Sequence, residues 1–420
     1  MIENSYDAAV AAVSQERLWQ RHMELARIGG LPAGGVKRLA LTEEDMLAQR
    51  VLLHWAGDRG YKCWRDEIGN IFVRRDGSDS EAAPIMTGSH LDTQPTGGKF
   101  DGAYGVLAGF EVLEAFDDAG VTTRRPVEVV AWMNEEGSRF VPGAMGSAVF
   151  AGTAALADML ARTDPAGISV SAALAQTAEA CPIAARALGS VRPAAYVEAH
   201  IEQGPRLEGE GATIGVVLGI QGIRRFSVEV IGEEAHAGTT PRRHRKDAVS
   251  AATAAIAALE HLTADNEDAI RFTVGRMEVF PNSPNTIPGR VTFSIDLRHP
   301  DEDLLTRLGE RIHEVACDAV ATRRCTATVV NISFVKPTTF APKVVDLVRR
   351  MANELGIRNL DLPSGAGHDA MHLSRACPTG MIFVPCLHGV SHNEAESATP
   401  EDLAAGTRVL ARVVLQMANE

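Results

Sequence analysis

The sequence predicts an α/β protein in which a doubly wound, mostly parallel sheet is interrupted by an inserted α+β domain. Three observations predict this class. Short apolar segments alternate with amphipathic helical patterns over the first half of the chain, as in parallel sheets covered by helices. From about Gly215 apolar and polar residues alternate singly, and after about Lys336 the first pattern returns. We therefore expect residues 1–214 and 336–420 to form one domain and residues 215–335 an inserted one.

The first domain is expected to open with two helices. A helical pattern covers residues 7–28 and stops at two glycines, and a second begins at Thr42, whose side chain can cap its first turn. Leu47, Val51 and Trp55 fall on one face of this second helix. A later helix is striped by apolar residues at 106, 110 and 113. The expected buried strands are 85–88, 127–133, 194–199 and 381–385.

The inserted segment has a different pattern. Phe226, Val228 and Val230 alternate with polar residues, as in a strand with one face in water. The elements expected after that strand are helix 247–261, strands 271–280 and 291–298, helix 301–321 and strand 326–334. This βαββαβ order is typical of small α+β domains.

The amino-acid composition disfavours several classes of binding partner. The 420 residues include 41 Lys and Arg against 54 Asp and Glu, a net charge of −13. Nucleic acid and anionic membranes are unfavoured partners, because both need a basic surface. The longest uncharged stretch, 140–157, is broken by proline and glycines, and the N-terminus does not resemble a signal peptide. Six scattered cysteines form no CxxC pair, so a reducing cytoplasm is the expected location.

His, Asp or Glu residues follow four of the expected strands. Ligands of open α/β sheets bind beyond the carboxyl ends of the strands, and imidazole and carboxylate groups hold Zn²⁺, Mn²⁺ and related cations. The five candidate ligands are His90, Asp101, Glu136, His200 and His392. Five ligands are too many for one catalytic zinc ion with an open position, but they suit two ions that share one carboxylate.

Two further acids lie beside these ligands in the sequence. Asp92 is placed to accept the other N–H of His90. Glu135 and Glu136 are adjacent, so their side chains diverge, and one can face a metal while the other takes a proton from water. Taken singly, a histidine at a strand end is usually structural and adjacent acids are normally a solvated turn. From spacing alone, a metal centre and a set of structural residues are about equally supported.

Eight motifs decide between these interpretations. In order they are GSHLDTQPTGGKFDGAYGV (Gly88 to Val106), NEEGSRF (Asn134 to Phe140), EAHIEQGPRLE (Glu198 to Glu208), EEAHAGTTP (Glu233 to Pro241), SPNTIPG (Ser283 to Gly289), DLRHP (Asp296 to Pro300), SGAGHDA (Ser364 to Ala370) and GVSHNEAE (Gly389 to Glu396). Together they resemble the M20 metallopeptidase superfamily. More narrowly, they resemble its amidase/hydantoinase/carbamoylase branch, which contains N-carbamoyl-L-amino acid hydrolases, β-ureidopropionases and allantoate amidohydrolases. The resemblance covers nearly the whole chain.

The resemblance implies a catalytic domain with two divalent metal ions per subunit, of zinc, manganese, cobalt or nickel. Glu135 would be the general base. The implied ligand sets are His90, Asp101 and His200 for one ion, and Asp101, Glu136 and His392 for the other.

The resemblance also implies that residues 215–335 form the lid and the dimerisation domain of a homodimer. His236 would come across the dimer interface to stabilise the oxyanion. Asn285 and Arg298 would bind the carboxylate end of the substrate, since a guanidinium suits bidentate contact with a carboxylate. The other residues implied to line the site are Gln203 and Gly367.

The implied reaction is hydrolysis of the C–N bond of a carbamoyl or ureido group on a small carboxylic acid, which yields the free amino acid, ammonia and carbon dioxide. An allantoate amidohydrolase and an aminoacylase or peptidase remain alternatives. A non-catalytic metal-binding protein is a further one, although such a protein has no need of a free general base beside two metal ions.

Overall fold

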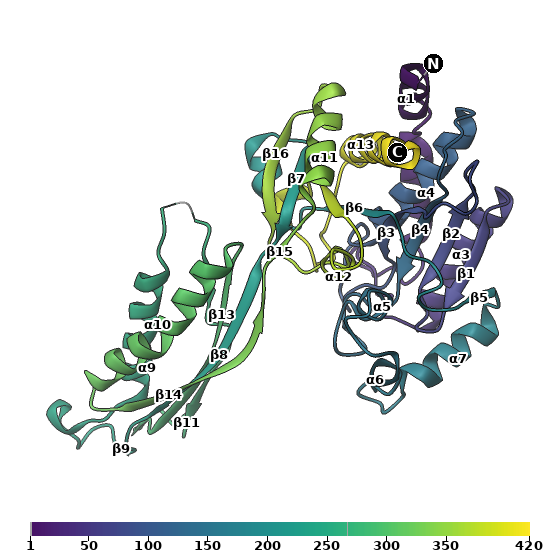
Figure 1. Cartoon of the computed structure of the whole chain (residues 1–420). Coiled ribbons are helices and arrows are strands. Elements are labelled where there is room, and N and C mark those ends of the chain that lie inside the picture. Colours follow the sequence, from purple (N-terminus) through teal and green to yellow (C-terminus); the bar gives the residue numbers. More distant parts are fainter. Residues whose placement is uncertain (1, 267) are drawn as a thin grey trace. The chain divides into compact units, whose positions relative to one another are not determined.

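The backbone of the computed structural model, which describes residues 2–266 and 268–420, divides into two compact units (Figure 1). The large unit runs up to Leu218 and resumes at Thr339, and the inserted unit comprises Gly219–Thr338. The boundary predicted at residue 215 falls inside strand β7 (Ile214–Ile220), which pairs with another strand of the large unit. The large unit therefore ends a few residues later than the alternation pattern suggested.

The large unit contains a mixed sheet in the order β15-β7-β17-β6-β3-β4-β2-β1-β5, with β16 paired to β7. Its four central strands, β17, β6, β3 and β4, are parallel to one another. β7 and β2 flank them in antiparallel orientation. The predicted mostly parallel α/β sheet is thus confirmed. The strands not yet delimited are β1 (Lys62–Asp66), β2 (Ile71–Arg75), β3 (Ile85–His90), β4 (Val127–Trp132), β5 (Ala184–Arg186), β6 (Ala195–Ile201), β15 (Thr338–Thr339), β16 (Asn359–Ser364) and β17 (Thr379–Val384).

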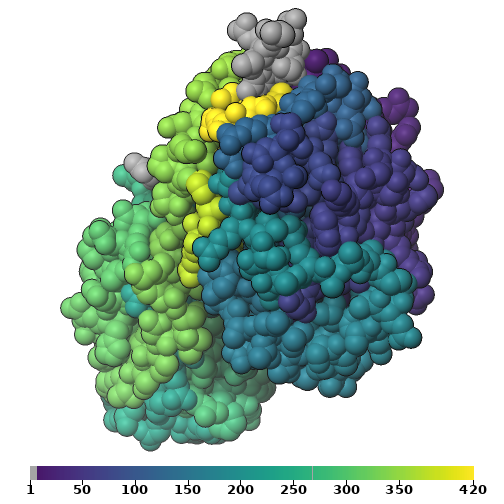
Figure 2. All heavy atoms as spheres, turned by 45° about the vertical axis from the view of Figure 1, so that its right-hand side comes forward, coloured from purple at the N-terminus to yellow at the C-terminus, as the bar shows by residue number. Residues whose placement is uncertain are grey.

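Helices cover both faces of this sheet. The helices of the large unit are α1 (Ile2–Ala11), α2 (Gln15–Leu25), α3 (Glu43–Asp58), α4 (Ala103–Asp118), α5 (Met145–Phe150), α6 (Leu156–Leu160), α7 (Val170–Ala180), α8 (Arg206–Glu210), α11 (Pro342–Glu354), α12 (Ala370–Leu373) and α13 (Pro400–Asn419), with a 3-10 turn η2 (Leu387–Gly389). α4 lies close to Val129 of β4, whereas Trp132 of the same strand packs on Phe150 of α5. Residues an odd number apart in a strand point to opposite faces, so α4 and α5 lie on opposite sides. Figure 2 shows the end of α13 (yellow) against segments from the first third of the chain (blue), in line with its packing on α2 and α4.

Two expectations about the first helices were wrong. The pattern at 7–28 is not one helix, because Ser14 caps α2 with its side chain and donates its backbone N–H to Glu111. On α3, capped by Thr42 as predicted, the buried face carries Ala48, Leu52 and Trp55, whereas Leu47 is exposed.

The inserted unit is a sheet in the order β10-β13-β8-β14 with two helices on one face. Its elements are β8 (Gly222–Ile231), β9 (Ala235–His236), η1 (Arg242–His244), α9 (Ala248–Thr263), β10 (Arg271–Thr273), β11 (Met277–Phe280), β12 (Thr286–Ile287), β13 (Arg290–His299), α10 (Glu302–Ala321) and β14 (Thr326–Val335). The alternating Phe226, Val228 and Val230 face the helices, as predicted. The strand predicted at 271–280 is two short strands, and both pair with β13. Within the described residues, the helices are too short or too polar to cross a membrane.

Candidate active site

Polar side chains converge at the carboxyl edge of the parallel strands of the large unit. His90 ends β3, Glu135 and Glu136 follow β4, His200 lies near the end of β6, and His392 is in the loop after β17. Because these four strands are parallel neighbours, their carboxyl ends meet at one edge of the sheet. Asp101 reaches the same place from the loop that precedes α4.

Asp101 is at the centre of this cluster. Its Oδ1 lies 3.2 Å from Nε2 of His200 and 3.9 Å from Nε2 of His90. Its Oδ2 lies 3.3 Å from Nε2 of His392, which is 3.4 Å from Oε2 of Glu136. The structure therefore brings the five candidate ligands into two groups, His90–Asp101–His200 and Asp101–Glu136–His392, which share Asp101.

The two buried imidazoles turn the same nitrogen toward Asp101. Nδ1 of His90 lies 2.9 Å from the carbonyl oxygen of Asp92, and Nδ1 of His200 lies 2.9 Å from that of Ile201. A carbonyl only accepts, so Nδ1 of each ring carries a proton and Nε2 is the nitrogen that faces the cluster. Gly102 permits this packing, since it has a φ of 66° and a Cβ there would lie 2.2 Å from the His90 ring.

Asp92 differs from the prediction. Its carboxylate lies 3.8 Å from Nδ1 of His90, too far for a hydrogen bond, and the backbone carbonyl holds the imidazole instead. The carboxylate accepts hydrogen bonds from the backbone N–H groups of Glu135 and Glu136, both at 3.2 Å. Asp92 thus holds the turn after β4 in place and positions the two glutamates.

The side chains of Glu135 and Glu136 diverge. Oε2 of Glu135 lies 3.4 Å from Nε2 of His90, whereas Glu136 faces His392 and accepts a hydrogen bond from Nε2 of Gln94 at 2.6 Å. Burial raises the pKa of Glu135 well above its usual range, and the charge of Asp369 adds to the effect. Burial and the charge of Asp101 raise the pKa of Glu136 to about 7.

The donor set fits divalent cations. Two ligand atoms bound to one tetrahedral zinc ion at about 2.0–2.1 Å are about 3.3 Å apart, close to the 3.2 Å and 3.3 Å between Asp101 and its two nearest imidazoles. Although burial opposes it, the hydrogen bond to Asp101 raises the pKa of His200 to about 9, and the same kind of bond raises that of His392 to about 9. Positive charge is therefore stabilised on both sides of Asp101, where a cation would replace the imidazole protons.

Several residues of the cluster were missed in the sequence. Nε2 of Gln203, predicted only to line the site, donates to Oδ2 of Asp101 at 2.9 Å. The Ser391 hydroxyl lies 3.0 Å from the same oxygen, and the buried Glu396 contacts Ser391 and the Asp101 loop. Gln94, Ser391 and Glu396 lie inside the motifs that carry the candidate ligands, and this proximity was the available signal.

A second layer of polar residues lies behind His200. The His368 ring packs edge-on against that of His200, with centroids 4.5 Å apart, and its Nε2 lies 3.0 Å from the hydroxyl of Ser364. Glu198 accepts hydrogen bonds from Ser89 and Tyr196. Gly367 lies exposed in the loop that carries His368. The His368 ring, held by Ser364, therefore supports the His200 ring from this side.

The inserted unit holds the remaining predicted residues in two places. His236 in β9 is paired with Thr286 in β12, beside Asn285. Strand β13 begins at Arg290, shortly after β12. Arg298, which contacts Asp296, is near the opposite end of this strand. At about 3.3 Å per residue, this run of β13 spans about 26 Å. The shared grip of Asn285 and Arg298 on one carboxylate stays a prediction.

Two backbone N–H groups set the tautomer of His236. Those of Gly238 and Thr239 donate to its Nδ1 at 3.0 and 3.1 Å. Nδ1 is then an acceptor, so the proton of the neutral ring lies on Nε2, which can donate a hydrogen bond.

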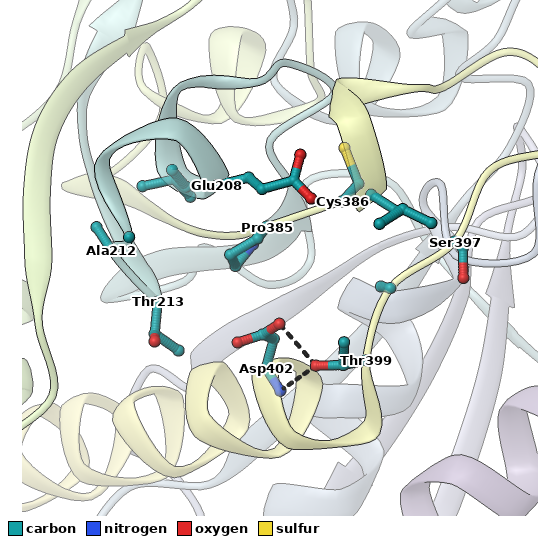
Figure 3. Close-up of a pocket in the computed structure, with 12 residues that line it drawn as sticks. Glu208, Ala212, Thr213, Pro385, Cys386, Ser397, Thr399 and Asp402 are labelled. Atoms are coloured by element: carbon teal, nitrogen blue, oxygen red, sulfur yellow. Dashed lines mark hydrogen bonds between the residues drawn. The ribbon is translucent and has the colours of Figure 1, made fainter.

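A pocket of about 300 Å³ lies at the two ends of the loop that carries His392 (Figure 3). Pro385 and Cys386 form one wall where the loop begins, and Ser397 and Thr399 line it where the loop ends. Its acidic residues have local partners, since Asp402 accepts a hydrogen bond from Thr399 and Glu208 from the backbone of His388.

Comparisons with known proteins agree with this geometry. The sequence matches the model of the peptidase family M20/M25/M40 over residues 86–416. An N-carbamoyl-L-amino-acid amidohydrolase of Rhizobium meliloti is 40% identical, with 97% of each chain covered. An allantoate amidohydrolase of Bacillus subtilis is 34% identical, with 94% of this chain and 95% of that one covered. The solved structure of an amidase of the hydantoinase/carbamoylase family from Burkholderia multivorans has a TM-score of 0.93 and 43% identity, covering 97% of this chain and 98% of the other.

These matches span the segment from His90 to His392 and include the inserted unit. They confirm the resemblance that the eight motifs indicated and make the chain a hydrolase of amide-type C–N bonds. The chain belongs to the peptidase family M20/M25/M40.

Proposed function

We propose that the protein hydrolyses the C–N bond of a carbamoyl or ureido group on a small carboxylic acid, such as an N-carbamoyl-L-amino acid or 3-ureidopropionate. The observation that carries the proposal is the pair of ligand groups that share Asp101, with Glu135 beside them and outside both. The relative named N-carbamoyl-L-amino-acid amidohydrolase supports this substrate class.

Two divalent ions, of zinc, manganese, cobalt or nickel, belong to this proposal. His90, Asp101 and His200 would hold one ion, and Asp101, Glu136 and His392 the other, with Asp101 bridging. When bound, such ions polarise a carbonyl oxygen and acidify water.

Glu135 acts as the general base. Its pKa, raised by burial, suits a group that takes a proton near neutral pH. Glu135 removes a proton from the attacking water, whose oxygen bonds to the carbamoyl carbon. The C–N bond then breaks as Glu135 returns the proton to the leaving nitrogen. Release of carbon dioxide from the resulting carbamate leaves the free amino acid and ammonia.

A second copy of the chain completes the site. Arg298 binds the substrate carboxylate, with Gln203 and the backbone near Gly367 lining the pocket. His236 and Asn285, which lie beside each other at the two-stranded sheet of β9 and β12, come from the partner of a homodimer. The Nε2–H of His236 then donates to the developing oxyanion. The inserted unit acts as lid and dimerisation domain, and closure of such a lid excludes water.

The test is ammonia release over a panel of N-carbamoyl-L-amino acids, 3-ureidopropionate, allantoate and N-acetyl amino acids. Highest kcat/KM on one of the first two substrates supports the proposal. Preference for allantoate would favour the second candidate, an allantoate amidohydrolase, which the 34% identical relative of that name supports. Turnover of the N-acetyl compounds alone would overturn both.

A further inference from the structure

We infer that Glu396 is a positioning residue that holds Asp101 and His392 in fixed positions relative to each other. Glu396 thereby sets the affinity for the ion that Asp101, Glu136 and His392 would bind. The inference rests on the proposed metal roles. It concerns a residue outside both ligand groups, whose carboxylate links two loops that lie far apart in the sequence.

One oxygen of Glu396 holds the Asp101 loop. Oε1 accepts hydrogen bonds from the backbone N–H groups of Phe100 at 2.8 Å and Asp101 at 3.1 Å. The side chain is 3% exposed, so these bonds are shielded from water. A Cβ at Gly98 would lie 1.9 Å from the Glu396 carboxyl carbon, and only glycine leaves room for the carboxylate there.

The other oxygen of Glu396 reaches the second loop. Oε2 lies 2.9 Å from the hydroxyl of Ser391, which is also 3.0 Å from Oδ2 of Asp101. The single proton of this hydroxyl is donated to one carboxylate or the other. Ser391 directly precedes His392, so one carboxylate restrains the backbones next to two candidate ligands.

His392 depends on such a restraint more than the other ligands do. Its side chain is 50% exposed, against 5% or less for its neighbours Asp101 and Glu136. Its backbone has a φ of 52°, a conformation that surrounding contacts must maintain in a non-glycine residue. The pocket of about 300 Å³ is lined by residues from both ends of its loop (Figure 3). Glu396 supplies a contact that can maintain the loop.

Two substitutions of Glu396 distinguish the effect of the position of its carboxylate from the effect of its charge. Glu396→Gln keeps an oxygen that can accept from both N–H groups but removes the charge, whereas Glu396→Asp keeps the charge and withdraws the carboxylate by about 1.5 Å. Asp247→Ala is a matched control, because Asp247 also accepts two backbone N–H bonds, from Val249 and Ser250, but in the inserted unit.

Zn²⁺ and Co²⁺ binding to the full-length protein would be measured by equilibrium dialysis, with the Co²⁺ absorption spectrum as a second readout. We expect Glu396→Asp to weaken binding of one of two ions by about 10–100-fold, the usual loss when a partner of a metal ligand is removed. Its kcat should recover in excess metal. Glu396→Gln should lose less than about tenfold, and Asp247→Ala should bind both ions as the wild type does.

Wild-type affinity in Glu396→Asp would overturn the inference, and so would a larger loss in Glu396→Gln than in Glu396→Asp, because charge rather than position would then matter. Fewer than two ions in the wild-type protein would overturn the proposed function itself.

Discussion

The two regions that supply candidate site residues are built in opposite ways. In the large unit, His90, Asp101 and His200 are almost fully buried, and each has a hydrogen-bond partner supplied by the fold. In the inserted unit, His236 and Asn285 are exposed, and Arg298 lies in a different sheet, near the end of β13. The comparison teaches that one chain can gather the candidate ligands of the proposed metal centre by itself, whereas the proposed substrate-binding groups of the inserted unit lie on an exposed surface and at a strand end.

The largest expected effect is a loss of catalytic activity in the large unit without a change in its structure. Glu135→Gln keeps the shape of the side chain but removes the general base, so kcat should fall by about 10²–10⁴-fold. Metal content should stay at the wild-type value, because Glu135 lies outside both ligand groups. Elemental analysis and steady-state kinetics on the same preparation test this. A variant with wild-type kcat would remove Glu135 from the mechanism.

The second effect tests whether the inserted unit of one chain contributes to the active site of its partner in a dimer. His236→Ala should lower kcat by about 10²–10³-fold, as loss of an oxyanion donor does. If His236 serves the partner's site, a re-assembled equal mixture of Glu135→Gln and His236→Ala chains should regain about a quarter of wild-type activity, since half the dimers are mixed and each has one intact site. A mixture as inactive as its components would place both residues in one chain's site.

A smaller effect should separate substrate binding from the metal centre. Arg298→Ala removes the proposed carboxylate partner, so KM should rise by about 10–100-fold, consistent with loss of a charged hydrogen-bonded contact. Arg298→Lys should recover part of the loss, because the ammonium keeps the charge without the bidentate geometry. Loss of metal from Arg298→Ala would contradict the separation of the two regions.

The smallest expected effect concerns the stability that a buried histidine removes at low pH. His22 is completely buried against Phe100 and Tyr104, and burial lowers its pKa from 6.5 to about 3. The unfolded chain therefore binds more protons than the folded one between these pH values, and His22 makes stability fall as the pH drops below about 6.5. His22→Phe should reduce this acid sensitivity in urea unfolding measured at pH 7 and pH 5. An unchanged pH dependence would show that His22 is not its source.

Strand ends were predictable from the sequence because a buried parallel strand is a short run of apolar residues, and the last residue of such a run can be identified in the sequence. This is why the positions of His90, Glu135 and His200 could be inferred. The buried face of α3 was not, because Leu47 and Leu52 are equally apolar and only tertiary packing decides that Leu52 is buried.

Hydrogen-bond partners were harder to predict. Asp92 was matched with the imidazole of His90 because of its proximity in sequence, yet the backbone carbonyl makes that contact and the carboxylate turns to the residues after β4. Glu396 meets Asp101 across nearly 300 residues of chain, and no local pattern reveals such a contact.

The position of β17 affects biosynthesis. This strand separates β6 from β7, its neighbours in space, although those two lie far earlier in the chain. During translation β6 is made long before the partner that will cover its edge, and an open edge readily pairs with the wrong strand. The growing chain must keep this edge of β6 open while more than a hundred further residues are synthesised, and a chain that ends after β6 but before β17 leaves that edge without its partner strand.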